Sequence, residues 1–440
     1  MQEDTLKVGV GRADITGPLL SVGMMGYARA AQRVEGVAVP LSARAYAFEA
    51  GREGARFVFL SAEVWGITQS VHLEVSRRLI TLHPELGIGE RNLMLTATHT
   101  HSGPGGYSHH LLFNLSIGGY AEPIFEAIVS GLCSAVVQAV EALAPGQVSM
   151  ASGHFPPAVQ VAFNRSLRAY NANRDVDKLA PHESHLAVDR EMTCVRLERL
   201  GGLPIGAINW FGVHASSLHA DNTEVHPDNK GLASIALEAY AEAHWGSSTF
   251  LAAFPQTSAG DVSPNSRWDS SRGCMVGQGE SDLESAHVNG ALQCQHAASL
   301  LEDSSGHTLL RPTIKVAFRY VDYACAPVDP EFGEGCAGGT TEPAVIGISM
   351  AEGTAEGPGP LYRLRGLTSL LNACVRTYGA FVRRIVPSSS SGRLASRGAK
   401  FPMFEPGRGA QGRFLGIFSQ AWGALFSRLD PTIARLYELR

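Results

Sequence analysis

The 440-residue chain is 45% hydrophobic and only 18% charged, so it can bury a substantial core and disorder is excluded as its default state. Its formal net charge of -5 and isoelectric point near 6.3 provide no basic stripe for a phosphate backbone, which argues against nucleic-acid binding. A small molecule or a lipid fits better as the substrate.

The sequence carries no clear signal for a compartment. No apolar run reaches the roughly 20 residues that a bilayer-spanning helix needs, and the N-terminus lacks the basic start and apolar stretch of a signal peptide. The seven cysteines are scattered, without the paired spacing of a structural zinc site. Cys325 and Cys336 are candidates for a disulfide in an oxidising compartment, and buried free thiols are the alternative. Compartment and oligomeric state therefore stay open.

Short apolar runs alternate with helical patterns over the first 320 residues, which predicts an α/β fold with a mixed sheet flanked by helices. The expected strands are 8–10, 45–48, 57–62, 93–97 and 249–254. The expected helices are 69–82, 123–143, 230–243 and 282–301, the second with an apolar stripe of Ile124, Ile128, Leu132, Val136 and Val140. Two further strands, 192–200 and 205–213, flank Gly201-Gly202, which is typical of a hairpin.

Composition changes after about Asp322, where Gly-rich stretches begin and a Ser-rich segment with basic residues follows. We interpret the chain as an α/β domain over 1–384, a linker or exposed loop over 385–412, and a helical tail over 413–440.

The strongest functional signal is a His-x-His pair, His99 and His101, directly after the apolar strand 93–97 and before a Gly-rich turn. In an extended segment, residues i and i+2 point to the same side, so both imidazoles are expected to face one point at the end of the strand. Strand ends are where α/β folds build their sites. The alternative is a pair of loop histidines that only hydrogen-bond the turn.

A second polar cluster follows the strand 205–213. His214 lies nearest this strand and is expected to complete a ligand pair with the first cluster, because zinc favours neutral histidine nitrogens. His219 and His226 are expected to be loop residues without a metal role.

A third polar motif follows the strand 249–254 and contains Ser263 before Pro264. This serine either makes an ordinary turn or presents its hydroxyl to a site. The sequence lacks the Gly-x-Ser-x-Gly motif of α/β hydrolases, which ranks a Ser-His-Asp hydrolase low.

At these residues the chain resembles the neutral ceramidase family, over about residues 7 to 365. The matching stretches occur in the family's order: Gly9 to Gly17, Met24-Met25-Gly26-Tyr27, the His99/His101 block, Asn164-Arg165-Ser166, Trp210 to His214, Asp228-Asn229-Lys230-Gly231, the Ser263 turn, and Ala351-Glu352-Gly353-Thr354 running to Gly359-Pro360. The combined pattern is much more specific than any one block.

The resemblance implies a zinc-dependent amidohydrolase that cleaves the N-acyl amide bond of ceramide to sphingosine and a fatty acid. By motif, its zinc ligands correspond to His99 and His214, and its donor to the reacting amide oxygen corresponds to His101. Arg165 matches the family's site arginine and Ser263 its active-site serine. Zn²⁺ is then the expected cofactor and ceramide the expected partner, with contact to a membrane surface.

The family pattern also implies a glutamate and a tyrosine that complete the zinc shell, and the chain shows no motif for them. We therefore expect the domain 1–384 to be incomplete at its C-terminal end and the metal site to be open on one side, with Glu405 or Tyr437 as candidate replacements. Three readings stay open: an active zinc ceramidase, a truncated or diverged lipid-binding homologue without catalysis, and a zinc-free serine amidase or esterase.

Overall fold

The computed structural model divides the chain into two compact units, Met1–Ala317 and Phe318–Arg440. The first unit is described over 6–317 apart from 52–53 and 115. In the second unit the described residues are 318–329, 331–332, 340–341, 346–347, 350, 352–359, 362–364, 366–367, 369–370, 373–374, 377, 402–405, 413–414 and 417–418.

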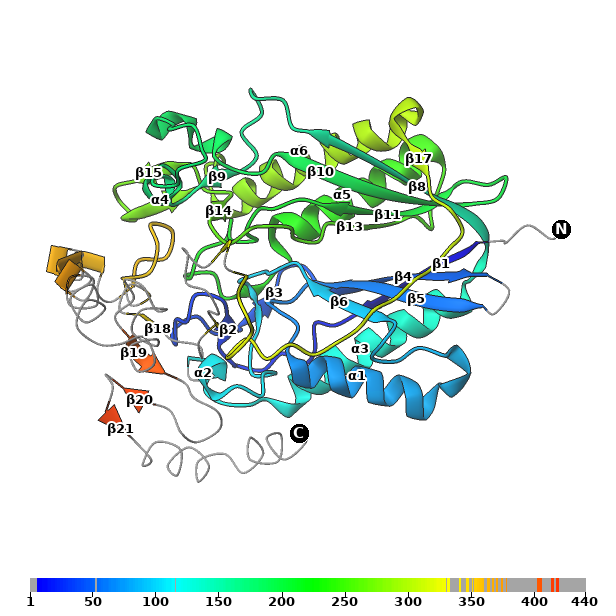
Figure 1. Ribbon diagram of the computed structural model, residues 1–440, viewed down its shortest axis with the longest axis horizontal. Coiled ribbons are helices and arrows are strands. Elements are labelled where there is room, and N and C mark those ends of the chain that lie inside the picture. Colours follow the sequence, from blue (N-terminus) through cyan, green and yellow to red (C-terminus); the bar gives the residue numbers. More distant parts are fainter. Residues whose placement is uncertain are drawn as a thin grey trace. The chain divides into compact units, whose positions relative to one another are not determined.

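One mixed sheet dominates the first unit, with the strand order β13-β11-β10-β8-β1-β4-β5-β6 and β17 beside β8 (Figure 1). Its strands are β1 (Lys7–Asp14), β4 (Ser42–Ala50), β5 (Ala55–Ala62), β6 (Leu93–Ala97), β8 (Ala144–His154), β10 (Glu191–Arg199), β11 (Pro204–Trp210), β13 (Leu251–Ala253) and β17 (Thr308–Leu309). Paired strands are antiparallel except for β5 with β6 and β11 with β13. The predicted mixed sheet is confirmed, as is the hairpin between β10 and β11.

The sheet folds back on itself, so that its two halves face each other. One half contains β1, β4, β5 and β6, and the other contains β8, β10, β11 and β13. Buried aromatic residues fill the space between them: the Tyr46 hydroxyl lies 3.1 Å from the carbonyl oxygens of both Ala207 and Leu251. Phe59 packs edge-on against Trp210, with ring centroids 5.3 Å apart. Apolar burial between the halves is what holds them together.

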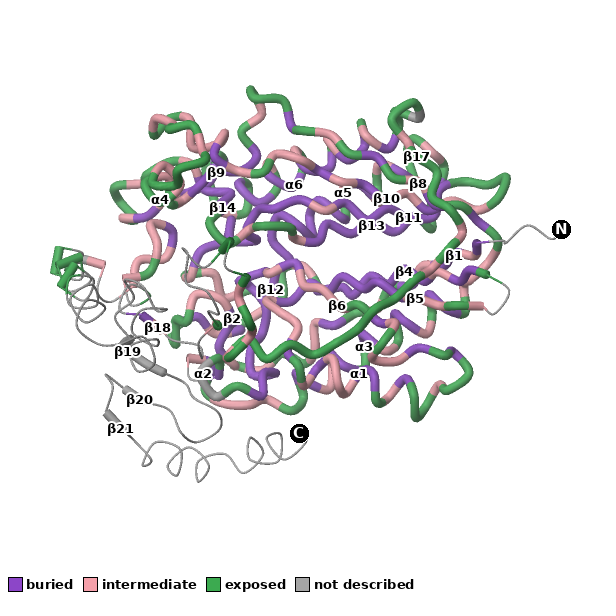
Figure 2. The backbone as a smooth tube through the Cα atoms, in the orientation of Figure 1, coloured by how far each residue is buried: buried purple, intermediate pink, exposed green. Residues whose placement is uncertain are grey.

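Helices cover the outer face of each half. On the first half lie α1 (Gln69–Leu82) and α3 (Glu122–Glu141), and on the second lie α5 (Asp228–Trp245) and α6 (Asp282–Glu302). The predicted apolar stripe of α3 is buried at all five positions, and the helix lies so close to β1 that a Cβ on Gly11 would come 2.3 Å from the Ala135 carbonyl oxygen. Figure 2 shows buried chain running along the strands of both halves.

By length and composition, α3 would be able to cross a membrane, which corrects the expectation that no apolar run is long enough. However, 61% of its most apolar stretch is buried inside the protein. Core helices of globular proteins are also apolar, because they bury that surface against a sheet.

The remaining elements are short. The two-stranded ribbons pair β2 (Met24–Met25) with β7 (Gly103–Pro104), β3 (Gly36–Val37) with β12 (Glu224–Val225), β9 (Phe163–Asn164) with β14 (Val262–Ser263), and β15 (Arg267–Asp269) with β16 (Cys274–Val276). The short helices of the first unit are η1 (Pro84–Leu86), α2 (Leu111–Asn114), α4 (Leu167–Tyr170), η2 (Pro181–Leu186) and η3 (Ser304–Gly306).

The second unit contains a four-stranded sheet and η4 (Tyr362–Leu364). The sheet orders β18 (Ile346–Gly347), β19 (Pro402–Glu405), β20 (Arg413–Phe414) and β21 (Ile417–Phe418). In the predicted helical tail over 413–440, the residues of β20 and β21 form strands in place of the expected helix. A short apolar run cannot be assigned to helix or strand by its periodicity alone. The predicted boundary at 384/385, the rest of the linker and tail, Cys336 and Tyr437 lie outside the described residues.

Candidate metal centre

Three histidines converge at one end of the folded sheet. His99 and His101 follow β6 in one half, and His214 follows β11 in the other. Each offers a ring nitrogen such that the three nitrogens lie within 4.8 Å of one another. The centroid of the His99 ring lies 4.9 Å from the ring centroid of His101 and 4.9 Å from that of His214. The structure therefore brings together the three histidines singled out in the sequence.

The path of the chain through the His-x-His pair differs from the expected one. β6 ends at Ala97, and His99 has a φ of 70°, in the left-handed region. Thr100 then pairs with Ala215 through an isolated β-bridge. The directions of the two rings therefore depend on a kink at His99 and not on the regular alternation of a strand. A non-glycine residue with left-handed backbone angles costs about 1–3 kcal/mol of conformational strain. Such strain persists only where surrounding contacts determine the backbone.

Backbone carbonyls fix the orientation of two of the rings. His99 Nδ1 lies 2.6 Å from the Trp65 carbonyl oxygen, and His214 Nδ1 lies 2.6 Å from that of Ala259 and 3.1 Å from that of Val262. A ring nitrogen that faces a carbonyl must carry the hydrogen, so Nδ1 donates in both residues. The lone pair is then on Nε2, as in histidines that bind a metal.

His101 is buried, and neither of its ring nitrogens has a hydrogen-bond partner among the described residues. Tyr27 packs edge-on against its ring at 4.7 Å between centroids. Gly26 has a φ of 138°, and a Cβ there would come 2.4 Å from the His101 ring, which explains why glycine precedes Tyr27. Leaving a buried imidazole unpaired is costly unless a further group binds there. The donor set therefore fits a metal ion with a polar substrate beside it.

Electrostatics keep the three rings neutral. Burial is the largest cause that lowers the pKa of each, and the charge of Arg165 acts in the same direction. The pKa of His214 falls to about 3, and that of His101 lies well below its ordinary value. Neutral imidazole is the form that binds a metal, so the site is ready for one at neutral pH.

Arg165 lies beside this cluster. Its Nη2 donates to the Gly260 carbonyl oxygen at 2.6 Å and lies 3.4 Å from His214 Nε2. The preceding Asn164 is buried, and its side-chain amide donates to Ala187 and Asp261, so the glycosylation sequon that it starts is not exposed.

Ser263 lies in β14, and its Oγ accepts a hydrogen bond from the Asn265 backbone at 2.8 Å. This is the turn chemistry that the sequence allowed. In the described part of the chain, no hydrogen bond joins Ser263 to a histidine. Its neighbour Val262 instead supports His214 through its carbonyl oxygen.

Comparison with known proteins places the chain in a family. The sequence family described as neutral/alkaline non-lysosomal ceramidase, N-terminal, matches residues 6–389. The chain belongs to the neutral/alkaline ceramidase family. It is 36% identical over 378 residues to the neutral ceramidase of Pseudomonas aeruginosa, covering 83% of this chain and 52% of that protein. It is 35% identical to the neutral ceramidase of Mycobacterium tuberculosis, covering 80% and 54%.

Solved ceramidase structures have the same fold. A structure titled "Ceramidase complexed with C2" superposes with a TM-score of 0.70 at 36% identity and covers 82% of this chain and 53% of that one. The α/β fold assigned from the sequence is thereby confirmed. The chain spans about half the length of the curated ceramidases that it matches.

The carbonyl groups that orient the ceramidase histidines had no signal in the sequence. Trp65, Ala259 and Val262 act through backbone atoms, which every residue type supplies. The motif around Ser263 directly follows Ala259 and Val262, so it pointed to this stretch of the chain but not to its carbonyl groups.

His219 and His226 lie outside the three-histidine group. The His219 ring contacts Asp282 Oδ2 at 2.9 Å and the Met275 carbonyl oxygen at 2.8 Å, and His226 Nδ1 accepts from the Asp228 backbone at 2.9 Å. Asp282 also receives two hydrogen bonds from Arg272. Partial burial opposes the charge of Asp282, yet His219 and Arg272 hold the pKa of its carboxyl well below the ordinary value.

Substituting Asp282→Asn is expected to destabilise the fold by about 1.5–3 kcal/mol at pH 5.5, the range for hydrogen bonds to charged groups. Burial tends to lower the pKa of His219, but Asp282 raises it above 6.5. The stabilisation is fully present below pH 6.5 and is lost as the pH rises through the raised pKa of His219. At acid pH it is lost below pH 3.8, as the pH falls through the lowered pKa of Asp282. Urea unfolding at pH 5.5 and 8.5 measures this. An equal loss at both pH values would contradict a charged pair between His219 and Asp282.

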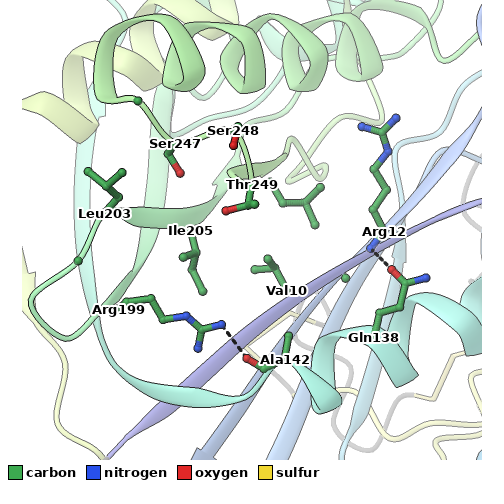
Figure 3. A pocket seen from close by; sticks show the side chains of 14 residues that line it. Val10, Arg12, Gln138, Ala142, Arg199, Leu203, Ile205, Ser247, Ser248 and Thr249 are labelled. Atoms are coloured by element: carbon green, nitrogen blue, oxygen red, sulfur yellow. Dashed lines mark hydrogen bonds between the residues drawn. The ribbon is translucent and has the colours of Figure 1, made fainter.

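A cavity lies at another place in the fold. It has a volume of about 680 Å³ and is lined by residues at the start of β11 and β13, with Arg12 and Arg199 (Figure 3). Arg199 directs its guanidinium to the carbonyl oxygens of Val8 and Ala142. Because His214 follows the opposite end of β11, this cavity does not belong to the histidine cluster.

Proposed function

We propose that this chain carries the histidine centre of a zinc-dependent amidohydrolase that cleaves the N-acyl amide bond of ceramide to sphingosine and a fatty acid. The observation that carries the proposal is the group of three neutral histidines in a member of the neutral/alkaline ceramidase family, one of which has no partner for either ring nitrogen within the described part of the chain. Ceramide is a lipid, so contact with a membrane surface is part of the same proposal.

In this proposal His99 and His214 would hold the zinc ion, each through the Nε2 that its Nδ1 hydrogen bond leaves free of hydrogen. Bound zinc would supply Lewis-acid activation of the attacking water and of the amide carbonyl. The water oxygen adds to the carbonyl carbon, the C–N bond breaks, and the amine leaves with a proton that comes from the water. His101 donates a hydrogen bond to the amide oxygen, where negative charge develops.

Arg165 and Ser263 have supporting roles in the proposal. The guanidinium of Arg165, 3.4 Å from His214 Nε2, adds positive charge close to the developing oxyanion. Ser263 accepts a hydrogen bond from the Asn265 backbone, and this bond fixes the position of its hydroxyl. In the proposal the hydroxyl is a polar contact within the site.

Two other functions remain as outcomes of the test. A lipid-binding homologue without catalysis would retain the fold but not hydrolyse ceramide. A zinc-free serine amidase would need a base beside its nucleophile, and no histidine in the described residues is hydrogen-bonded to Ser263.

The test measures zinc per chain after dialysis against metal-free buffer, together with hydrolysis of a ceramide labelled in its acyl chain. Stoichiometric zinc and release of labelled fatty acid that stops with a chelator and resumes with Zn²⁺ are expected. Hydrolysis that persists without metal would favour the serine mechanism. Zinc or ceramide binding without hydrolysis would favour the non-catalytic homologue.

Substituting His101→Ala is expected to lower turnover by about 10²–10³-fold, the loss typical of one oxyanion donor, while zinc content stays at the wild-type level. The reason is that His101 contacts the amide oxygen and not the metal in this proposal. Zinc analysis and ceramide kinetics on the same preparation measure both quantities. Zinc loss in this variant would make His101 a third metal ligand instead.

A further inference from the structure

We propose that the segment 226–230, at the start of α5, holds the two histidine-bearing loops in one fixed arrangement and so sets the geometry of the metal site. The inference rests on the proposed zinc function. It assigns positioning roles to residues outside the three-histidine group. The segment comprises His226, Pro227, Asp228, Asn229 and Lys230, and all five residues are buried.

The first contact is with the loop that carries His99 and His101. Thr100, which lies between the two histidines, donates from Oγ1 to the His226 carbonyl oxygen at 2.8 Å. The His226 backbone N–H donates to the carbonyl oxygen of Ser102 at 2.9 Å. Hydrogen bonds to His226 thus involve the residues on both sides of His101 in the chain, Thr100 and Ser102.

The second contact is with the loop that carries His214. Asn229 donates from Nδ2 to the His214 carbonyl oxygen at 2.9 Å and to Ser217 Oγ at 3.1 Å. The Asp228 carboxylate accepts from the backbone N–H groups of Ser217 and Leu218 at 3.1 and 3.0 Å. These bonds fix the backbone on and after His214.

Lys230 extends this contact to the end of strand β11. Its Nζ donates to the Phe211 carbonyl oxygen at 2.6 Å and lies 5.3 Å from the centroid of the Phe211 ring. A fully buried lysine is an expensive way to stabilise a fold, because an apolar side chain of similar size avoids its desolvation. The bond to Phe211 therefore points to a need for an exact backbone position three residues before His214.

Backbone strain in the segment agrees with this role. Asp228 has a φ of 55°, and its carboxylate also accepts from the Asn229 backbone at 2.6 Å. A non-glycine residue keeps left-handed backbone angles only where surrounding contacts hold it there, and here those contacts come from the two histidine-bearing loops. His99, the residue before Thr100, also has a positive φ, of 70°. The segment 226–230 thus contacts the histidine-bearing loops of both sheet halves.

The experiment compares Zn²⁺ affinity, measured by competition with a chromophoric chelator, between wild type and paired variants. Thr100→Val removes the hydroxyl and keeps the shape, and Thr100→Ser restores the hydroxyl. Asn229→Ala removes the bond to His214. The control Asn92→Ala removes an asparagine that also donates to two backbone carbonyls, from Arg56 and Gly87, at the far end of β6.

Thr100→Val and Asn229→Ala are expected to weaken Zn²⁺ binding about tenfold or more, while Thr100→Ser and Asn92→Ala stay close to wild type. The visible spectrum of the Co²⁺-loaded protein should change in the first two variants only. Unchanged affinity in Thr100→Val and Asn229→Ala, or an equal loss in Asn92→Ala, would overturn the positioning role. Absence of Zn²⁺ binding by wild type itself would remove the proposed function, and this inference with it.

Discussion

His214→Ala is expected to lower Zn²⁺ affinity by more than about 100-fold, beyond the loss caused by residues that merely orient a ligand. In the proposed site this change leaves His99 as the single remaining ligand among the assigned pair, and one imidazole holds zinc weakly. Turnover of ceramide should fall with the metal content. Zinc analysis after dialysis and a direct titration with Zn²⁺ measure the effect.

The matched control is His244→Ala. His244 lies in the last turn of α5, at the opposite end of that helix from the histidine cluster, and stacks on Tyr240 at 3.9 Å between centroids. It should retain wild-type zinc content and turnover. Tight zinc binding by the His214→Ala variant would show that other residues hold the metal, and the assignment of His214 would be wrong.

The second large effect concerns a buried ion pair between the sheet and α5. Arg44 on β4 donates to Glu63 at 2.5 Å and to Glu238 at 2.8 Å, and its side chain is only 3% exposed. Burial opposes the charge, but the two carboxylates more than offset it and raise the pKa of Arg44. Arg44→Ala is expected to destabilise the fold by about 3–5 kcal/mol, since it leaves buried carboxylates without their cation. Urea unfolding at pH 7 measures this loss.

Arg12 provides a close control for Arg44. It lies directly opposite Arg44 in the β1–β4 register and contacts the same Glu238 at 3.3 Å, but its side chain is 55% exposed. Arg12→Ala should therefore cost about 1 kcal/mol or less. Equal losses for the two substitutions would mean that burial does not decide the strength of this network.

The major helices and most strands of the sheet were readable from the sequence. The 69–82 pattern gave the bounds of α1, and the apolar stripe on α3 is buried as expected. These elements follow from local periodicity, which each segment carries by itself. Strand β8 was missed because its sequence contains few apolar residues, and it exists through pairing with β10 and β1. Pairing partners far away in the chain leave no local pattern.

The residues of the candidate site were also named from the sequence, because zinc chemistry requires histidine and the family motifs occur in order. What the sequence did not contain was their convergence. β6 and β11 belong to different halves of the sheet, and their ends meet only because apolar burial folds those halves together. The ring orientations depend on backbone carbonyls of Trp65 and Ala259, and these leave no signal in the sequence because every residue type has one. Sequence alone determined which side chains are available for the chemistry; tertiary structure decided where they meet and which nitrogen each presents.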